Sequence, residues 1–194
     1  MFKLDPCSGL LAEARQVASP NCDERPADCE PGLIVVHGIS LPPGEYGGPW
    51  IDQLFTNTLL AKEHPYFAEI AGLRVSAHFL IHRDGGLVQY VPVHQRAWHA
   101  GESCFGGREC CNDFSVGIEL EGEDQTPYEK AQYHCLATLI DSLRAQNDSL
   151  TNAHIVGHSD VAPGRKTDPG EAFDWRYLET LLTTNGNDSG TGTD

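Results

Sequence analysis

Two short apolar runs, each leading into a histidine, constrain the fold of this chain more than any other feature. Residues 33–36 lead directly into His37, and residues 153–156 lead through a glycine into His158. Runs of this length and composition predict buried β-strands. Because the ends of strands in one sheet tend to lie together, we expect the two imidazoles to meet. A nearby carboxylate would then complete a three-ligand metal site of the catalytic type, which keeps a fourth position open.

The turn-rich segment 157–170 contains two aspartates that could supply this carboxylate. Asp160 lies two residues after His158, where it could simply cap a turn. Asp168 lies ten residues after His158 and precedes a proline, which restrains its backbone to an extended conformation. Lys166 would point to the same side as Asp168 on an extended segment. There it could stabilise an oxyanion, or it could be a solvated surface lysine.

A third predicted strand carries two acids on one face. Residues 116–121 alternate strictly, so that Glu119 and Glu121 point away from the apolar side. If this strand is central, at least one of the two carboxylates is buried and needs a partner. A general base for a metal-activated water is one such role, and pairing with an arginine is the other. The spacing does not choose between them.

Several further residues are candidates for binding a substrate. Residues 98–101 join an aromatic ring, a histidine and two small residues, a combination that could line a groove for a sugar or peptide or could pack in the core. Arginines can anchor substrate carboxylates through paired hydrogen bonds. The candidates of this kind are Arg74, Arg96 and Arg108.

The remaining patterns predict a hairpin and two long helices. Strand-like residues 75–81 and 87–91 flank an Asp-Gly-Gly turn. Residues 126–129 form a capping box with proline at the first helical position, followed by a helical stripe of Leu136, Leu139, Ile140 and Leu143. Residues 172–182 predict a final amphipathic helix.

These elements predict one domain of the α/β (α+β mixed) class, in which helices flank a central mixed sheet of about five strands. We expect residues 1–31 to form an irregular N-terminal arm, with a short helix conceivable at 10–17, and residues 32–182 to form the functional domain. The segment 183–194 contains Gly, Ser, Thr, Asn and Asp and is expected to be a disordered tail.

Composition limits the classes of partner. The net charge of −15 argues against a nucleic-acid backbone and against an anionic membrane surface. No apolar run approaches the roughly 18 to 20 residues that span a bilayer, and the first residues do not resemble a signal peptide. The seven cysteines therefore suggest reduced thiols in a cytosolic protein. A structural zinc site at Cys104, Cys110 and Cys111 is a conceivable alternative.

Several motifs, in order along the chain, resemble the zinc-dependent N-acetylmuramoyl-L-alanine amidases, and specifically the cytosolic AmpD type. They include VVHGISLPPG, RAWHAG, CNDFS, GIELEG and GHSDVAPGRKTDPG. The matching stretches are residues 35–44, 47–52, 73–78, 96–101, 111–115, 117–122 and 157–170. The resemblance covers roughly residues 33–180. It departs at Gly38, where many members have asparagine, and at Cys110, where an arginine is expected.

Carried over by position, the resemblance implies that His37, His158 and Asp168 bind one zinc ion per chain. It implies that Glu119 is the catalytic acid–base group and that Lys166 assists the transition state. The residues expected to contact substrate are Arg74, Trp98, His99, Ala100, Arg108 and Asn112.

The implied reaction is hydrolysis of the amide that joins the lactyl group of 1,6-anhydro-N-acetylmuramic acid to L-alanine of the stem peptide. The implied setting is cytosolic peptidoglycan recycling, and thereby β-lactamase regulation, with a small muropeptide as the partner and a monomeric protein. Two alternatives remain. One is a broad-specificity periplasmic peptidoglycan amidase, and the other is a module that binds muropeptides without cutting them.

Overall fold

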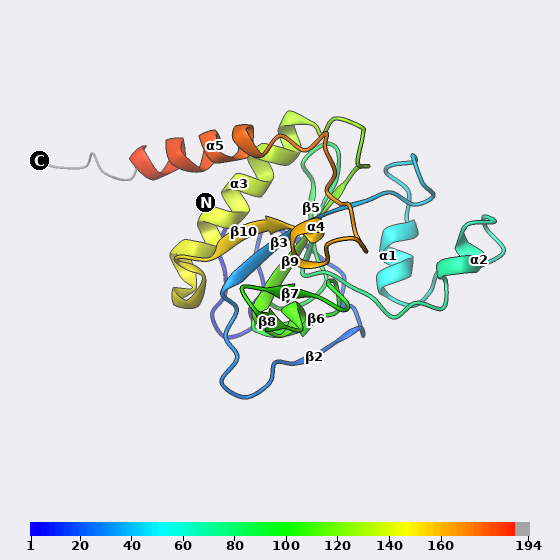
Figure 1. Ribbon diagram of the computed structural model, residues 1–194, viewed down its shortest axis with the longest axis horizontal. Coiled ribbons are helices and arrows are strands. Elements are labelled where there is room, and N and C mark those ends of the chain that lie inside the picture. Colours follow the sequence, from blue (N-terminus) through cyan, green and yellow to red (C-terminus); the bar gives the residue numbers. More distant parts are fainter. Residues whose placement is uncertain (189–194) are drawn as a thin grey trace, which may run out of the picture.

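The chain folds around a six-stranded mixed sheet (Figure 1). The computed structural model describes residues 1–188, and side chains as far as Thr183. Across the sheet the strand order is β1 (Arg15–Gln16), β5 (Leu87–Gln89), β4 (Phe79–Ile81), β9 (Ser115–Glu121), β3 (Leu33–Ile39) and β10 (His154–Gly157). All neighbours are parallel except β4 and β5, which form the predicted antiparallel hairpin. The expected mixed α/β class is confirmed.

One face of the sheet is covered by α3 (Lys130–Gln146) and α5 (Trp175–Asp188), which lie together in Figure 1. The predicted stripe of α3 is fully buried against the alternating apolar residues of β3 and β9. Each such side chain contributes roughly 1.5–3 kcal/mol by leaving water. The β-strand residues in this layer are Ile34, Val36, Val116, Ile118 and Leu120.

The opposite face carries two separate apolar clusters. One gathers around α1 (Trp50–Phe55) and α2 (Phe67–Ile70) and contacts the sheet through Leu80 and Val88. The other packs on Leu33 and Val35 beneath η1 (Cys111–Phe114) and α4 (His158–Val161). Strand pairing sets Leu80 beside Glu119 and Glu119 beside His37, so these two polar side chains share this face with both clusters.

The N-terminal arm is more regular than expected. The conceivable helix at 10–17 is absent, since β1 occupies its end and pairs with β5, where it forms one edge of the sheet. The side chain of Gln89 accepts from the Leu11 N–H and donates to the Gly9 carbonyl, so these two backbone groups of the arm are paired without a helix. Farther along, β2 (Cys22–Glu24) pairs with β6 (Gln95–Ala97). A second hairpin joins β7 (Cys104–Phe105) to β8 (Arg108–Glu109).

The boundaries of both long helices differ from those predicted. The capping box of α3 is formed by Glu129 and Gln132, because Thr126 bonds back to Glu123 in a tight turn. The final helix, α5, begins at Trp175 rather than at 172, and it continues through Asp188, where a disordered tail was expected from 183. Once a helix is docked, each further residue adds one hydrogen bond at little cost. The rest of the predicted tail, 189–194, lies outside the described residues.

Within residues 1–188, no helix combines the length and the apolar character needed to cross a membrane.

Candidate active site

Three predicted ligands meet at the ends of neighbouring strands. His37 belongs to β3, and His158 begins α4 directly after β10, whose Gly157 pairs with Val36. The Nδ1 atoms of the two histidines lie 3.0 Å apart. Oδ2 of Asp168 lies 3.2 Å from the His37 Nδ1 and 3.1 Å from the His158 Nδ1. The parallel pairing of β3 with β10 therefore creates the cluster that the sequence predicted.

The protonation of this cluster suits a cation. Burial lowers the pKa of His37 to about 4, so its ring is neutral near pH 7. Burial alone would raise the pKa of Asp168. The contacts with His37 and His158 outweigh burial and lower this pKa overall, so the carboxyl is ionised. The His158 Nε2 faces the carbonyl of Ala100 at 3.2 Å and must donate there, so Nδ1 is the ring nitrogen that faces His37 and Asp168. This donor set could hold a metal ion.

The alternative ligands lie elsewhere. Asp160 accepts the Gly157 N–H at 2.7 Å and so caps α4, the turn-capping role that the sequence allowed. Cys104 and Cys110 are exposed while Cys111 is buried. Among the described residues, His37, His158 and Asp168 are the group whose ligand atoms converge within 4.8 Å.

Glu119 and Glu121 differ sharply in their surroundings. Glu119 lies opposite His37, with Oε1 4.0 Å from the His37 Nδ1, and its buried Oε2 has no hydrogen-bond partner among the described residues. Burial raises the pKa of Glu119 well above its ordinary value; the charge of Asp168 adds to this and Lys166 opposes it.

Glu121 is instead fully engaged. Its carboxylate accepts the N–H groups of Gly47 and Arg83 and lies 3.1 Å from Nδ1 of His82. Burial raises its pKa, but these three contacts outweigh that effect and lower it overall. Of the two acids, Glu119 is therefore the one free to exchange a proton with a bound molecule.

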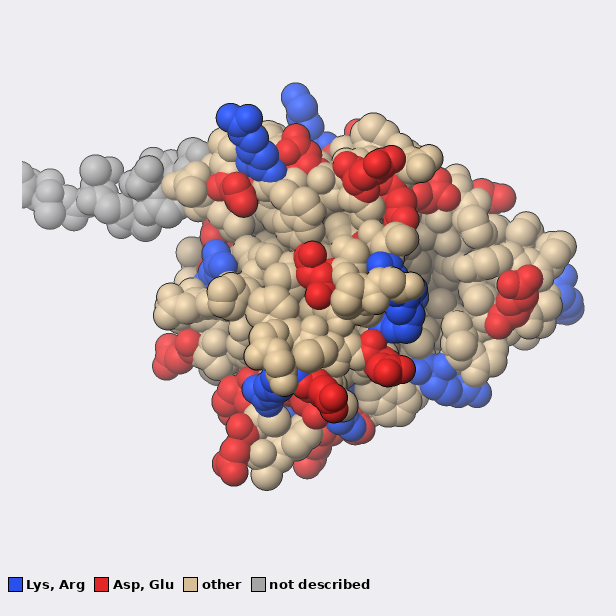
Figure 2. Space-filling model, in the orientation of Figure 1, with Lys and Arg blue, Asp and Glu red and all other residues tan. Residues whose placement is uncertain are grey.

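The cluster opens into a cavity of about 710 Å³. Figure 2 shows the molecule hollowed on this face, between α4 and the lobe that carries α1 and α2. One wall is apolar, with Tyr66, Ile70, Leu73 and Val75, and the other is polar, with residues 122–126. The exposed Lys166 lines the cavity together with Glu119 and the three clustered residues.

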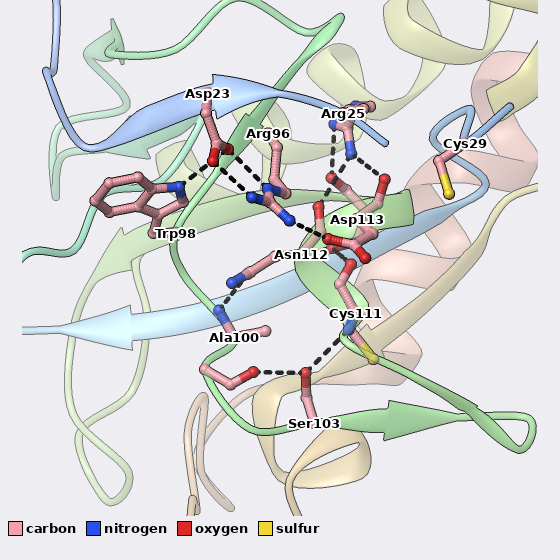
Figure 3. Close-up of polar contacts among 12 residues, drawn as sticks. Asp23, Arg25, Cys29, Arg96, Trp98, Ala100, Ser103, Cys111, Asn112 and Asp113 are labelled. Carbon is pink, nitrogen blue, oxygen red and sulfur yellow. Dashed lines mark hydrogen bonds and ion pairs between the residues drawn. The ribbon is translucent and has the colours of Figure 1, made fainter. Parts of the chain in front are cut away.

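The six residues predicted to contact substrate do not all line this cavity. Of that set, His99 lines the cavity. The indole N–H of Trp98 donates to Asp23, as Figure 3 shows. Oδ1 of Asn112 accepts the backbone N–H groups of both His99 and Ala100. Asn112 therefore holds the loop that carries His99, and the structure places neither Asn112 nor Trp98 on the cavity wall.

The three candidate arginines also lie in different surroundings. Arg96 bridges Asp23 and Asp113, at 2.5 and 2.6 Å (Figure 3). Arg108 lies over the ring of Phe114 and donates to the Cys29 sulfur. Arg74 is exposed and follows Leu73, a residue of the cavity wall.

One supporting residue was missed by the sequence reasoning. Tyr128 is buried, and its hydroxyl donates to the carbonyl of Pro169, next to Asp168. A Cβ at Gly38 would lie 2.3 Å from that hydroxyl. A larger residue than Gly38 would therefore collide with Tyr128. No local pattern indicates this contact, because Tyr128 and Gly38 lie 90 positions apart in the sequence.

Comparisons with known proteins agree with this geometry. The family model described as N-acetylmuramoyl-L-alanine amidase matches residues 28–171. The chain is 58% identical over 177 residues to the 1,6-anhydro-N-acetylmuramyl-L-alanine amidase AmpD of Enterobacter cloacae, covering 91% of this chain and 94% of that one.

Two solved structures extend the similarity. A crystal structure of a selenomethionine AmpD derivative superposes with a TM-score of 0.89 at 58% identity, covering 93% of this chain and 99% of the other. AmiD of E. coli, solved in complex with the substrate anhydro-N-acetylmuramic acid-L-Ala-D-γ-Glu-L-Lys, has a TM-score of 0.55 at 27% identity, covering 81% and 60%. The chain belongs to the N-acetylmuramoyl-L-alanine amidase family.

Proposed function

We propose that this protein hydrolyses the amide bond between the lactyl group of 1,6-anhydro-N-acetylmuramic acid and the L-alanine of the stem peptide, as a step in peptidoglycan recycling. The high identity to AmpD relatives supports the substrate class. The observation that carries the proposal is the convergence of three ligand atoms beside the unpartnered carboxylate of Glu119, at the base of an open cavity.

The metal in this proposal is one zinc ion per chain, held by His37, His158 and Asp168. Two imidazole nitrogens and one carboxylate oxygen match a catalytic zinc site. When bound, zinc would supply Lewis-acid polarisation of the scissile carbonyl and would lower the pKa of a neighbouring water.

Glu119 is the proposed general base and acid. Its raised pKa suits a carboxylate that must both accept and release a proton near neutrality. Glu119 receives the proton of the attacking water as the new C–O bond forms. It then delivers a proton to the alanine nitrogen as the C–N bond breaks, so that the products are a free acid and a free amine.

Lys166 provides the second proposed catalytic group. Its ammonium lines the same cavity and would stabilise the negative charge that develops on the carbonyl oxygen. The apolar wall at Tyr66 and Ile70 would receive the sugar, and the exposed Arg74 would attract a carboxylate of the stem peptide. We further propose that the protein acts in the cytoplasm, as a monomer, on small soluble muropeptides.

The test is hydrolysis of anhydromuramyl-tripeptide, followed by mass spectrometry, with and without a chelator. We expect release of free tripeptide that the chelator abolishes and zinc restores. Tight binding without release would make the protein a muropeptide-binding module and would remove the roles assigned to Glu119 and Lys166. Release that is insensitive to the chelator would contradict the metal assignment.

A further inference from the structure

A chain of buried hydrogen bonds runs from His37 through His99 and Ser115 to the backbone of Cys111. Nε2 of His37 lies 2.9 Å from Nδ1 of His99. The other ring nitrogen of His99 lies 3.1 Å from the hydroxyl of Ser115. That hydroxyl donates to the carbonyl of Cys111 at 2.6 Å. All four residues are buried.

The carbonyl at the far end fixes the direction of every bond. A carbonyl can only accept, so the Ser115 hydroxyl uses its one proton on Cys111 and must accept from His99. His99 therefore carries its proton on Nε2, and its Nδ1 is an acceptor. It follows that His37 donates from Nε2 and presents an unprotonated Nδ1 to His158 and Asp168.

Three features of the fold build this arrangement. The ring of His99 lies directly over Gly117, where a Cβ would come within 2.4 Å of the imidazole. The side chain of Asn112 fixes the backbone on both sides of the His99 carbonyl. One ring nitrogen of His99 faces His37 and the other faces Ser115, so the two nitrogens of a neutral ring supply one donor and one acceptor here.

We propose that His99 and Ser115 are positioning residues that set the tautomer of His37, so that its Nδ1 is ready for a metal before the metal arrives. His158 is oriented directly by a backbone carbonyl, whereas His37 is oriented by a carbonyl acting through a serine and a second histidine. Outer partners of this kind orient metal ligands and tune their affinity. His99 acts here through His37, a different role from the substrate contact that the sequence suggested.

The first test reads the tautomers directly in the metal-free protein, by two-bond 1H–15N NMR of the histidine rings. The prediction is a protonated Nε2 and a bare Nδ1 for both His37 and His99. A protonated Nδ1 on either ring would overturn the proposal. Because this measurement needs no metal, it is independent of the amidase function on which the proposal builds. If the wild-type protein did not bind zinc, the proposed amidase function would be overturned, but the tautomer assignment would not.

The second test compares zinc affinity in variants, by competition with a chromogenic chelator. His99→Ala removes the acceptor for His37 and should weaken binding about tenfold or more. His99→Asn places an amide oxygen near the position of Nδ1 and should restore most of that affinity. Ser115→Ala should weaken binding to an intermediate degree and allow His99 to populate both tautomers.

The matched control is Ser142→Ala, which removes another buried hydroxyl bonded to a carbonyl, within α3. Its zinc affinity should equal that of the wild type. Equal losses in His99→Ala and His99→Asn would show that ring volume matters rather than the acceptor. That result, or a Ser115→Ala variant with wild-type affinity and an unchanged His99 tautomer, would overturn the proposal.

Discussion

Two polar clusters lie on this protein, and they differ in how their hydrogen-bonding capacity is used. The cavity cluster consists of His37, Glu119, His158 and Asp168. Its ligand atoms face one another, and one Glu119 oxygen has no partner among the described residues. The arm cluster consists of Asp23, Arg25, Arg96 and Asp113 and ties the N-terminal arm to the loop before β9 (Figure 3).

Most hydrogen-bonding groups of the arm cluster have partners within the protein. The terminal nitrogens of Arg25 donate to carbonyls of Val93, Asn112, Asp113 and Ser115, although its Nε has no partner among the described residues. Charged groups paired in this way position the backbone. Acceptors that face one another without protons between them are costly unless a ligand joins them. The contrast separates residues whose polar groups are paired within the protein from residues whose ligand atoms face one another or have no partner among the described residues.

The largest expected effect is on turnover. Glu119→Gln should lower kcat by about 10²–10⁴, because it removes the proton acceptor, while zinc affinity and stability are retained. The matched variant Glu121→Gln should instead destabilise the fold, since Glu121 holds His82, Gly47 and Arg83. Steady-state kinetics and urea unfolding of both variants check this. Near wild-type turnover in Glu119→Gln would contradict the assignment of Glu119 as the proton acceptor.

The next effect is on metal affinity. Asp168→Asn removes the ligand charge and should weaken zinc binding by roughly 100-fold or more, beyond the usual effect of an outer partner. Asp160→Asn, which alters the cap of α4, should leave the affinity within a few-fold. Chelator competition measures both. If Asp160→Asn weakened zinc binding more than Asp168→Asn, Asp160 rather than Asp168 would be the ligand.

A smaller effect is expected for Asn112. Asn112→Ala leaves two buried N–H groups without their acceptor and should cost about 1–3 kcal/mol of unfolding free energy. Asn112→Asp retains the acceptor oxygen and should lose less. Urea unfolding gives the free energies, and kinetics gives KM. A raised KM with unchanged stability would return Asn112 to the substrate-binding role.

The smallest effect is a pH dependence of the arm cluster. The hydrogen bond from Arg96 lowers the pKa of Asp23 below its ordinary value of 3.8, partly offset by burial. A lowered folded-state pKa contributes stability that is present above pH 3.8 and is lost as pH falls through the folded value.

The comparison of metal-free wild type with Asp23→Asn tests this dependence. Their difference in unfolding free energy should be constant near neutrality and should shrink as the pH falls below 3.8. Urea unfolding at a series of pH values measures it. A difference that does not change with pH would show that the ion pair has no role in stability.

The sequence predicted the sheet and the cavity cluster well for a definite reason. Buried strands and the stripe of α3 follow from local periodicity, which the core preserves. His37 and His158 could be paired because parallel strands of one sheet place their ends together. Asp168 rather than Asp160 joined them because Asp160 is used within its own turn, which spacing alone could not reveal.

The contacts that the sequence did not reveal join residues distant in sequence. Trp98 and Asn112 resemble surface binding residues until Asp23 and the backbone of residues 99–100 are brought to them. Tyr128 and Gly38 constrain each other across 90 positions of the chain. The early strand β1 replaced a conceivable helix because it pairs with the side of β5 that faces away from β4. None of these arrangements is encoded by a local pattern.

Anomalous diffraction at the zinc edge, from crystals of the protein purified without a chelator, tests the central claim most directly. The account predicts one strong peak about 2.0–2.2 Å from the Nδ1 atoms of His37 and His158 and from a carboxylate oxygen of Asp168. Absence of a peak there in zinc-loaded crystals, or a peak at Cys104 and Cys110 instead, would contradict it.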